Sequence, residues 1–533
     1  MRNEYNLIDE PWIPVADHGR VGLADIFSRT DIRALGGNPI QKLAVMKLLL
    51  AIAQAACTPE DEEEWRKMGP EGLASRCLSY LERWRDRFFL FGEAPFLQMP
   101  AVESLVANRT DARLKKAKTP GKRKQEIQKG APKPFGAGFY PDLPSDNNSM
   151  LSHTMLGKEL DSGEQALFIL TLMNFAFAGK RVEGGMKSLA GTVLSDKHSA
   201  PAGPSLGGFV GQLHGLVVTG DLRKDVWLNV LTREQIEKAN RWPEGVGCPA
   251  WEAMPAHEQD ARAKAIRESY QGCLVGVSRF VYLKDGGIYY LDGIQYPKVS
   301  EGWFEPTLML DQSDKLPKAK YVNLEKRPWR ELPAFLSFLE SGSTAGFENM
   351  AFRVGVQRMK QRKERLCVWT GGIRVSSTSG DQSAKQDDDF LESTVWIDGD
   401  DLGTVWLNHL DLEMKGMDKL ASTVYGSLRN YFADLHATPE YAGAQAALGS
   451  NLFWQFCERD FQTLVDNCER GERESQAREA LRHRFVQHAH KVFDLYAPRE
   501  TARQLEAWAN RRPNPPAGYL ETAERQQPTT QGA

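Results

Sequence analysis

Paired cysteines are missing from this chain of 533 residues. Its seven cysteines are odd in number and scattered, and none follows the C-x-x-C spacing, which argues against a disulfide framework and a conventional zinc knuckle. We therefore expect a reducing, cytoplasmic environment. The opening residues, MRNEYNLIDEPW, lack the apolar core of a secretory signal. The longest apolar stretch, residues 40–57, is interrupted by Gln41, Lys42, Lys47 and Gln54, so we expect no membrane contact.

A strong overall charge is also absent, because the formal net charge is −3. This balance excludes a uniformly basic nucleic-acid coat protein, so any contact with nucleic acid must be local. Hydrophobic residues make up 41% of the chain, which is enough for an ordinary globular core. The length allows two or more domains.

Changes in residue pattern along the chain predict an α+β protein. Residues 1–400 mix helical and strand patterns and are predicted to form a large N-terminal domain with β-hairpins. Long amphipathic segments with short connections predict a C-terminal antiparallel bundle, expected to hold four helices, over residues 401–511. A basic, flexible loop is expected at about residues 101–155, and a disordered tail at 512–533.

Local signals place several elements within these domains. Asn38-Pro39 and Thr58-Pro59 punctuate a buried helix between them. Asp161 or Ser162 is expected to cap another apolar helix that ends near Gly179. Two hairpins are predicted, one turning at Asp285-Gly286-Gly287 and one around Gly371-Gly372.

Catalytic signatures are weak. The segment GGMKS is similar to the end of a phosphate loop, but Met186 stands where that motif needs glycine. Consecutive carboxylates at Asp387, Asp388 and Asp389 could bind Mg²⁺ in a nuclease, although such a run is usually a solvated loop. We expect neither an enzyme nor a bound cofactor or metal.

Local concentrations of positive charge are the more informative feature. The segment Arg113–Pro134 holds nine Lys or Arg residues and one acid, Glu126. Such a segment attracts phosphates and releases their counterions, while the alternative is a solvated surface loop. A second basic segment, FRVGVQRMKQRKER, surrounds Gln357 with only Glu364 to offset it. The members of the two groups chosen as candidate nucleic-acid contacts are Lys115, Lys116, Lys122, Arg123 and Lys124, and Arg353, Arg358, Lys360 and Arg362.

Four segments carry a resemblance to a known family. These are NLIDEPWIPV at 6–15, EAPFLQM at 93–99, the GGMKS loop, and DLRKDVWLNVL at 221–231. Together they resemble the CasA large subunit of the type I-E CRISPR Cascade, and the order of the expected domains agrees with that family. The resemblance covers nearly the whole chain, and its most specific piece is the opening decapeptide.

The resemblance implies a subunit that is not an enzyme. Such a subunit completes a surveillance complex with guide RNA and the other Cascade subunits. It recognises the protospacer-adjacent motif (PAM) in double-stranded target DNA, starts strand separation for R-loop formation, and helps to recruit the helicase–nuclease effector. Base pairing with the guide then reads the long sequence, while protein reads only the short motif.

The resemblance also implies site residues. The family's glycine loop corresponds to Gly184 and Gly185, running into Met186, Lys187 and Ser188. A glutamine that wedges the duplex open fits Gln357, with Gln361 as a nearby rival. A basic groove contact on a β-hairpin falls on Lys284 or Arg279. A loop that docks against the guide 5′ end and neighbouring subunits gives the candidates Asn147, Asn148, Leu151 and His153.

Two other functions remain open from the residues alone. One is a metal-dependent nuclease that uses Asp387, Asp388 and Asp389. The other is a purely structural subunit whose basic segments bind only RNA or partner proteins.

Overall fold

The computed structural model describes residues 3–135, 159–179, 201–312, 317–339, 347–378, 380–385 and 388–520. The chain divides into two compact units, which are described separately below. The first unit comprises residues 1–328, 347–358 and 367–394, and the second comprises 329–346, 359–366 and 395–533.

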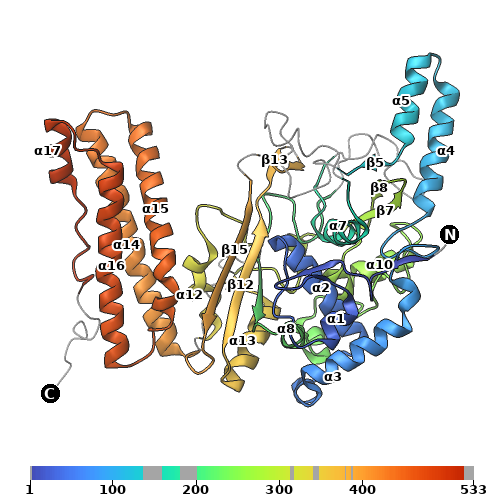
Figure 1. Ribbon diagram of the computed structural model, residues 1–533, viewed down its shortest axis with the longest axis horizontal. Coiled ribbons are helices and arrows are strands. Elements are labelled where there is room, and N and C mark those ends of the chain that lie inside the picture. The colour runs from blue at the N-terminus through green and yellow to red at the C-terminus, as the bar shows by residue number, and fades with distance from the viewer. Residues whose placement is uncertain are drawn as a thin grey trace. The chain divides into compact units, whose positions relative to one another are not determined.

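Helix α2 (Pro39–Ala56) forms the centre of the first unit (Figure 1). Its N-terminus is closed by Asn38 and Gln41, whose side chains accept from each other's backbone N–H groups in a capping box. The helix is long and apolar enough to cross a membrane, but 78% of it is buried within the fold. It packs against α3 (Glu62–Arg83) and α7 (Ser162–Phe175), and α7 begins at Asp161, one of the two caps that the sequence allows.

Small antiparallel sheets complete the first unit. Strand β12 (Leu366–Ile373) lies between β6 (His214–Val218) and β15 (Phe390–Ile397). Strands β7 (Arg279–Lys284) and β8 (Gly287–Asp292) form the predicted hairpin, with Asp285 and Gly286 at φ values of 49° and 71° in its turn. Short strands make up the other sheets: β1 (Glu4–Asn6) with β4 (Phe89–Phe91), β2 (Ile13–Val15) with β3 (Gly19–Val21), β13 (Ser376–Thr378) with β14 (Asp381–Ser383), and β9 (Leu310–Asp311) with β10 (Lys318–Ala319) and β11 (Phe347–Glu348).

Shorter helices link these sheets. They are α1 (Leu23–Ser28), α8 (Leu222–Asn229), α9 (Arg233–Ala239), α10 (Ala261–Arg267) and α11 (Tyr270–Leu274). Two further helices, α4 (Ala101–Lys116) and α5 (Pro120–Gly130), project as an antiparallel pair (Figure 1). Helix α13 (Met350–Arg362) runs from the first unit into the second.

A fully buried polar network ties the core of the first unit together. The Lys47 ammonium on α2 lies 2.6 Å from a carboxylate oxygen of Glu305, and both side chains are 0% exposed. Lys47 also donates to Ser205 at 2.8 Å, and Glu305 accepts from the hydroxyls of Ser205 and Thr307. Burial lowers the pKa of Lys47. Burial would raise the pKa of Glu305, but the neighbouring Lys47 and His214 outweigh it and lower that pKa, which favours an ion pair.

The second unit contains the helix bundle expected from the sequence. Helices α14 (Thr404–Asp434), α15 (Pro439–Val465) and α16 (Glu472–Tyr496) pack on one another, and the short α17 (Ala502–Arg511) packs on α14. The small helix α12 (Leu332–Phe335) also belongs to this unit. The α+β fold class with a C-terminal antiparallel helix bundle is therefore confirmed.

Three local expectations differ from the structure. The described part of the predicted loop at 101–155 is mostly helical, because α4 and α5 occupy residues 101–116 and 120–130. Gly371 and Gly372 lie inside strand β12 and not in a turn. Residues 512–520 of the predicted disordered tail pack on the bundle, where Tyr519 is 8% exposed.

The buried ion pair gives a stability prediction. Lys47→Met leaves the Glu305 carboxylate buried without its counter-charge, so we expect the free energy of unfolding to fall by about 3–5 kcal/mol. The double variant Lys47→Met/Glu305→Gln removes both charges and is expected to recover much of that loss. Denaturant unfolding followed by tryptophan fluorescence measures both.

Lys42→Met is the matched control on the same helix. Lys42 pairs with Glu392 at 2.7 Å but is 25% exposed, so its loss is expected to cost less than about 1 kcal/mol. A Lys47→Met variant as stable as Lys42→Met would contradict the importance of the buried pair.

Candidate nucleic-acid interface

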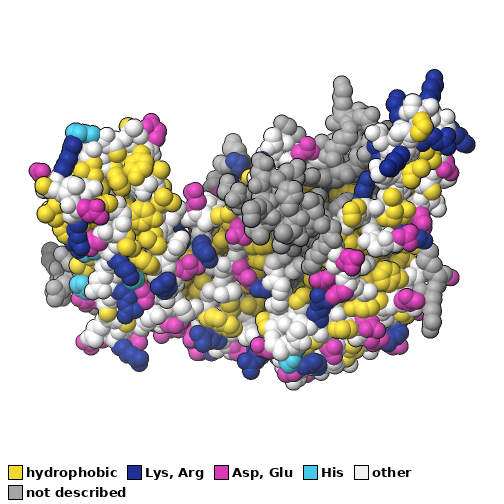
Figure 2. Space-filling model, turned by 45° about the horizontal axis from the view of Figure 1, so that its top comes forward, with side chains coloured by type: hydrophobic (Ala, Val, Ile, Leu, Met, Phe, Trp, Pro, Cys, Tyr) yellow, Lys and Arg dark blue, Asp and Glu magenta, His cyan; other side chains and the backbone are white. Residues whose placement is uncertain are grey.

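The α4–α5 hairpin carries the first group of candidate contacts. Lys115 and Lys116 end α4, and Lys122, Arg123 and Lys124 lie in the first turns of α5. All five side chains are exposed. Figure 2 shows dark-blue side chains gathered at the free end of this hairpin. The structure thus keeps this group available to an anionic partner, on two helices in place of the expected flexible loop.

The β7–β8 hairpin presents Lys284 beside the base of α4. The Lys284 ammonium lies 3.4 Å from the Glu103 carboxylate, whose charge raises the pKa of Lys284. Strand β5 (Lys133–Pro134), which follows α5, pairs with β8. The Lys284 hairpin and the α4–α5 hairpin are therefore joined at two points, by a side-chain ion pair and by a strand pairing.

Arg279 lies at the other end of β7 and has a different role from the predicted one. Its side chain is 0% exposed, so the expectation of a groove contact is wrong for this residue. One guanidinium nitrogen donates to the Phe177 carbonyl at 2.8 Å and to the Pro201 carbonyl at 2.6 Å. The other nitrogens donate to Tyr290 and Ser278. Of the two sequence candidates, only Lys284 is accessible.

These bonds join the two chain segments that flank residues 180–200. The segments also pair directly, since the Gly203 N–H donates to the Ala176 carbonyl at 2.7 Å and the Ser205 N–H donates to the Asn174 carbonyl at 2.9 Å. Gln382 on β14 holds the upstream segment through both the N–H and the carbonyl of Ala178. The described borders of the glycine-rich stretch are therefore closely fixed.

Helix α13 carries the second basic group and both candidate wedges. Gln357 and Gln361 are one helical turn apart and share an exposed face with Lys360. The helix begins near Asn349, whose side chain accepts from the Phe352 N–H at 2.9 Å. The chain around Gln357 packs against β6, α3 and α8, which fixes the direction of the exposed face.

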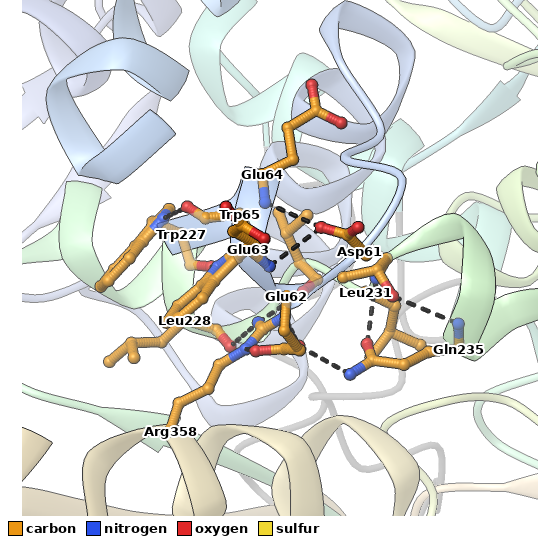
Figure 3. A network of polar contacts seen from close by, with 12 residues as sticks. Asp61, Glu62, Glu63, Glu64, Trp65, Trp227, Leu228, Leu231, Gln235 and Arg358 are labelled. Carbon is orange, nitrogen blue, oxygen red and sulfur yellow. Dashed lines mark hydrogen bonds and ion pairs between the residues drawn. The ribbon is translucent and has the colours of Figure 1, made fainter. Parts of the chain in front are cut away.

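Arg358 is buried, which corrects its assignment as a nucleic-acid contact. Figure 3 shows its guanidinium beside the Glu62 carboxylate, which it contacts at 2.6 Å. It also donates to the carbonyls of Leu228 and Val230 and stacks 3.9 Å from the centre of the Trp65 ring. Only 2% of its surface is exposed, and burial lowers the pKa of the guanidinium. Arg358 therefore anchors α13 to α3 and to the end of α8.

The rest of the second basic group is more accessible. Lys360 and Arg362 are exposed, and Arg353 is half-buried. Arg362 lies 2.7 Å from Glu364, so part of its charge is already offset.

Other sequence candidates fall outside the described residues. They are the glycine-loop residues Gly184, Gly185, Met186, Lys187 and Ser188, the assembly-loop residues Asn147, Asn148, Leu151 and His153, and Asp387.

The described carboxylates of the nuclease hypothesis serve local structure. One Asp388 oxygen accepts from the N–H groups of Ser376 and Lys385, and Asp389 accepts from the Phe390 N–H. Among the described residues, no group of three or more His, Cys, Asp or Glu side chains could hold a metal ion. Nothing in the described part of this region favours a metal-dependent nuclease.

Sequence reasoning missed one positioning residue, Gln98 in the segment EAPFLQM. Its amide nitrogen donates to the Leu90 carbonyl at 2.7 Å, and its amide oxygen accepts from the Leu283 N–H at 2.9 Å. The Met99 N–H donates to the Val281 carbonyl, so this segment supports β7 beside Lys284. A glutamine between apolar residues was the available signal, because a buried amide needs partners.

Comparisons with known proteins agree on one family. The chain matches the family described as CRISPR-associated protein Cse1 over residues 6–492. The CRISPR-associated protein CasA/Cse1 of Thermus thermophilus is 41% identical over 107 residues. That match spans 18% of this chain and 21% of the Thermus protein.

Solved structures share the fold over much greater lengths. The crystal structure of Thermus thermophilus CasA matches with a TM-score of 0.67 at 19% identity, covering 95% of this chain and 97% of that one. Thermobifida fusca Cse1 matches with 0.67 at 18% identity, covering 95% of each chain. A chain of a CRISPR RNA-guided surveillance complex matches with 0.64 at 14% identity, covering 96% of this chain and 99% of that one. Because the family match extends over most of its length, this chain belongs to the CRISPR-associated Cse1 family.

Proposed function

We propose that this chain is the non-catalytic large subunit of an RNA-guided CRISPR surveillance complex. In that complex it recognises the PAM in double-stranded target DNA, starts duplex unwinding for R-loop formation, and helps to recruit the helicase–nuclease. Its partners are guide RNA, the other Cascade subunits and the target duplex. It works in the cytoplasm and needs no cofactor.

The arrangement around strand β7 is the observation that carries this proposal. At one end of the strand, Arg279 binds the carbonyls of Phe177 and Pro201, which border the glycine-rich stretch. At the other end, Lys284 stands partly exposed at the hairpin turn. One rigid strand of six residues therefore links two elements that the resemblance assigns to motif reading.

Reading a short motif with glycines and one lysine suits the minor groove. Backbone without Cβ atoms can approach the groove floor closely. The groove offers a degenerate pattern, mainly A·T against G·C, so tolerance of several motifs is expected. Sequence beyond the motif is then left to guide pairing.

Strand opening needs a group that replaces base stacking. A glutamine amide is flat, and it can stack on a base pair while hydrogen-bonding to exposed base edges. Unstacking one step costs on the order of a few kcal/mol, which phosphate and groove contacts must offset. The exposure of Gln357 and Gln361 on α13 is compatible with this role, which remains a prediction from the resemblance.

The first test compares the complete complex with and without this chain. With the chain present, binding and opening of a guide-matched duplex are expected to depend on the motif beside the target. Gln357→Ala is expected to slow opening, measured with a fluorescent base analogue at the first paired positions, more than it weakens duplex capture. Gln361→Ala is the matched variant one helical turn away.

Equal binding of every motif would reduce the chain to a scaffold or a nonspecific clamp and overturn the proposal. If both glutamine variants open the duplex at the wild-type rate, neither glutamine is the wedge. That result would not affect the proposal of motif recognition. Loss of complex assembly without any duplex preference would favour a structural RNA-binding subunit.

A second prediction separates the two ends of β7. Arg279→Gln removes several bonds to buried carbonyls, so we expect a loss of about 2–4 kcal/mol in the free energy of unfolding. Lys284→Gln is expected to leave stability within about 0.5 kcal/mol and to weaken duplex capture, because its side chain is partly exposed. Thermal unfolding and duplex binding are measured on both variants.

An Arg279→Gln protein of full stability would contradict the structural role of Arg279. If Lys284→Gln binds the duplex as tightly as wild type does, Lys284 is not a DNA contact.

A further inference from the structure

The α4–α5 hairpin is a built structural element and not a loose basic segment. Arg113 on α4 pairs with Glu126 on α5 at 3.2 Å. A side chain at Gly130 would collide with the Thr110 side chain. Because glycine has no side chain, the two helices can cross closely at this point. At the base of the hairpin, Val102 and Val106 are buried where α4 packs against β7 and β8. The hairpin therefore holds its free end at a fixed place.

The charges at the start of α5 oppose the stability of that helix. The N-terminus of a helix carries partial positive charge, so acidic side chains are favourable there and basic ones are not. The first turn of α5 has no acid. Lys122, Arg123 and Lys124 instead add positive charge at this end, whereas Lys115 and Lys116 lie in the last turn of α4, where the helix dipole favours cations. A bound anion would relieve this repulsion, which distinguishes this end from an ordinary solvated helix face.

The distance from Lys284, the candidate groove contact, to the free end of the hairpin is set by the length of α4. Its base is tied to Lys284 through Glu103, and the β5–β8 pairing holds the same point. From Glu103 to Lys116, an α-helix rises by about 20 Å. Base pairs in a duplex follow one another about every 3.4 Å, so about 20 Å corresponds to at most about six base pairs, reached when α4 lies along the duplex axis.

We propose that the free end of the α4–α5 hairpin binds the phosphate backbone of the target duplex within about six base pairs of the motif, on the flank that stays double-stranded when the guide pairs. This inference rests on the proposed function, because it takes Lys284 as the groove contact. The contact is independent of sequence. It adds a phosphate contact beyond the motif and so slows dissociation of the complex from the duplex while the strands open.

The test neutralises the first turn of α5 in the complete complex. The variant is Lys122→Gln/Arg123→Gln/Lys124→Gln. If all three cations contact phosphates, the ratio of wild-type to variant affinity is expected to fall about 40-fold between 50 and 200 mM salt, since each contact contributes about 0.9 to the slope of log affinity against log salt. The melting temperature of the variant is expected to stay equal or to rise, because charges that oppose the helix dipole are removed.

Duplex length provides the second readout. Flanks of about three and about twelve base pairs beyond the motif bracket a reach of about six. Wild type is expected to bind the short flank more weakly than the long one, whereas the variant binds both equally. The matched control is Lys67→Gln/Arg233→Gln/Lys238→Gln, which removes three surface cations from α3 and α9 and should keep the flank dependence.

Each outcome decides between hypotheses. A variant with the same flank dependence and salt slope as wild type would overturn the inference, while motif-dependent opening would keep the proposed function. Loss of guide-RNA retention by the variant would assign the hairpin to RNA and also overturn it. Failure of the proposed function gives a different result, because duplex binding by the wild-type complex would then not depend on the motif. Lys122→Arg/Lys124→Arg, which keeps all three positive charges, is expected to bind as wild type does if charge is the cause.

Discussion

The Lys47–Glu305 ion pair is the constraint on which the arrangement of the first unit depends. Two full charges placed at 0% exposure are tolerable only when each finds partners in a fixed geometry. The partners come from distant parts of the chain: Asn174 on α7, Ser205 beyond the glycine-rich stretch, and Thr307 before β9. A hydrophobic core alone would accept many small shifts of these segments, whereas this network accepts few.

That constraint extends to the candidate interface. Ser205 belongs to the segment that pairs with residues 174–176. Arg279 then joins Phe177 to Pro201 and continues, through β7, to the hairpin that carries Lys284. Buried polar bonds thus fix the segments that carry the proposed contact surface for DNA. Such bonds are directional, so they define the positions of surface groups more sharply than apolar packing does.

The sequence predicts elements whose signals are local. Asn38 and Pro39 identify the start of α2, and Asp285-Gly286 identifies a tight turn, because each signal is satisfied within a few residues. The helices of the bundle follow from apolar residues at three- and four-residue spacing. These features need no knowledge of the rest of the fold.

The sequence fails where a side chain is satisfied by a distant partner. Arg358 stands among five other basic residues and looks like a surface contact, but its carboxylate partner Glu62 is 296 residues away in the chain. Arg279 binds carbonyls on both sides of a stretch that precedes it by about eighty residues or more, and no local pattern encodes that. In the same way, glycines at 371–372 suggest a turn, whereas in the fold they allow close packing: a side chain at Gly372 would collide with the Gln212 carbonyl.

Buried and exposed cations in this chain therefore follow opposite rules. Lys47, Arg279 and Arg358 are fixed by several oxygen partners each, so their charges stabilise the fold and are neutralised within it. The candidate cations at the end of the α4–α5 hairpin are exposed, and those in the first turns of α5 stand against the helix dipole, so the fold gains little from the α5 group. Counting basic residues along the sequence mixes these two groups. Among the candidate contacts that the structure describes, separating them by burial leaves those at the end of the α4–α5 hairpin, on the β7–β8 turn and on the exposed face of α13. These would give a protein of net charge −3 its local affinity for nucleic acid.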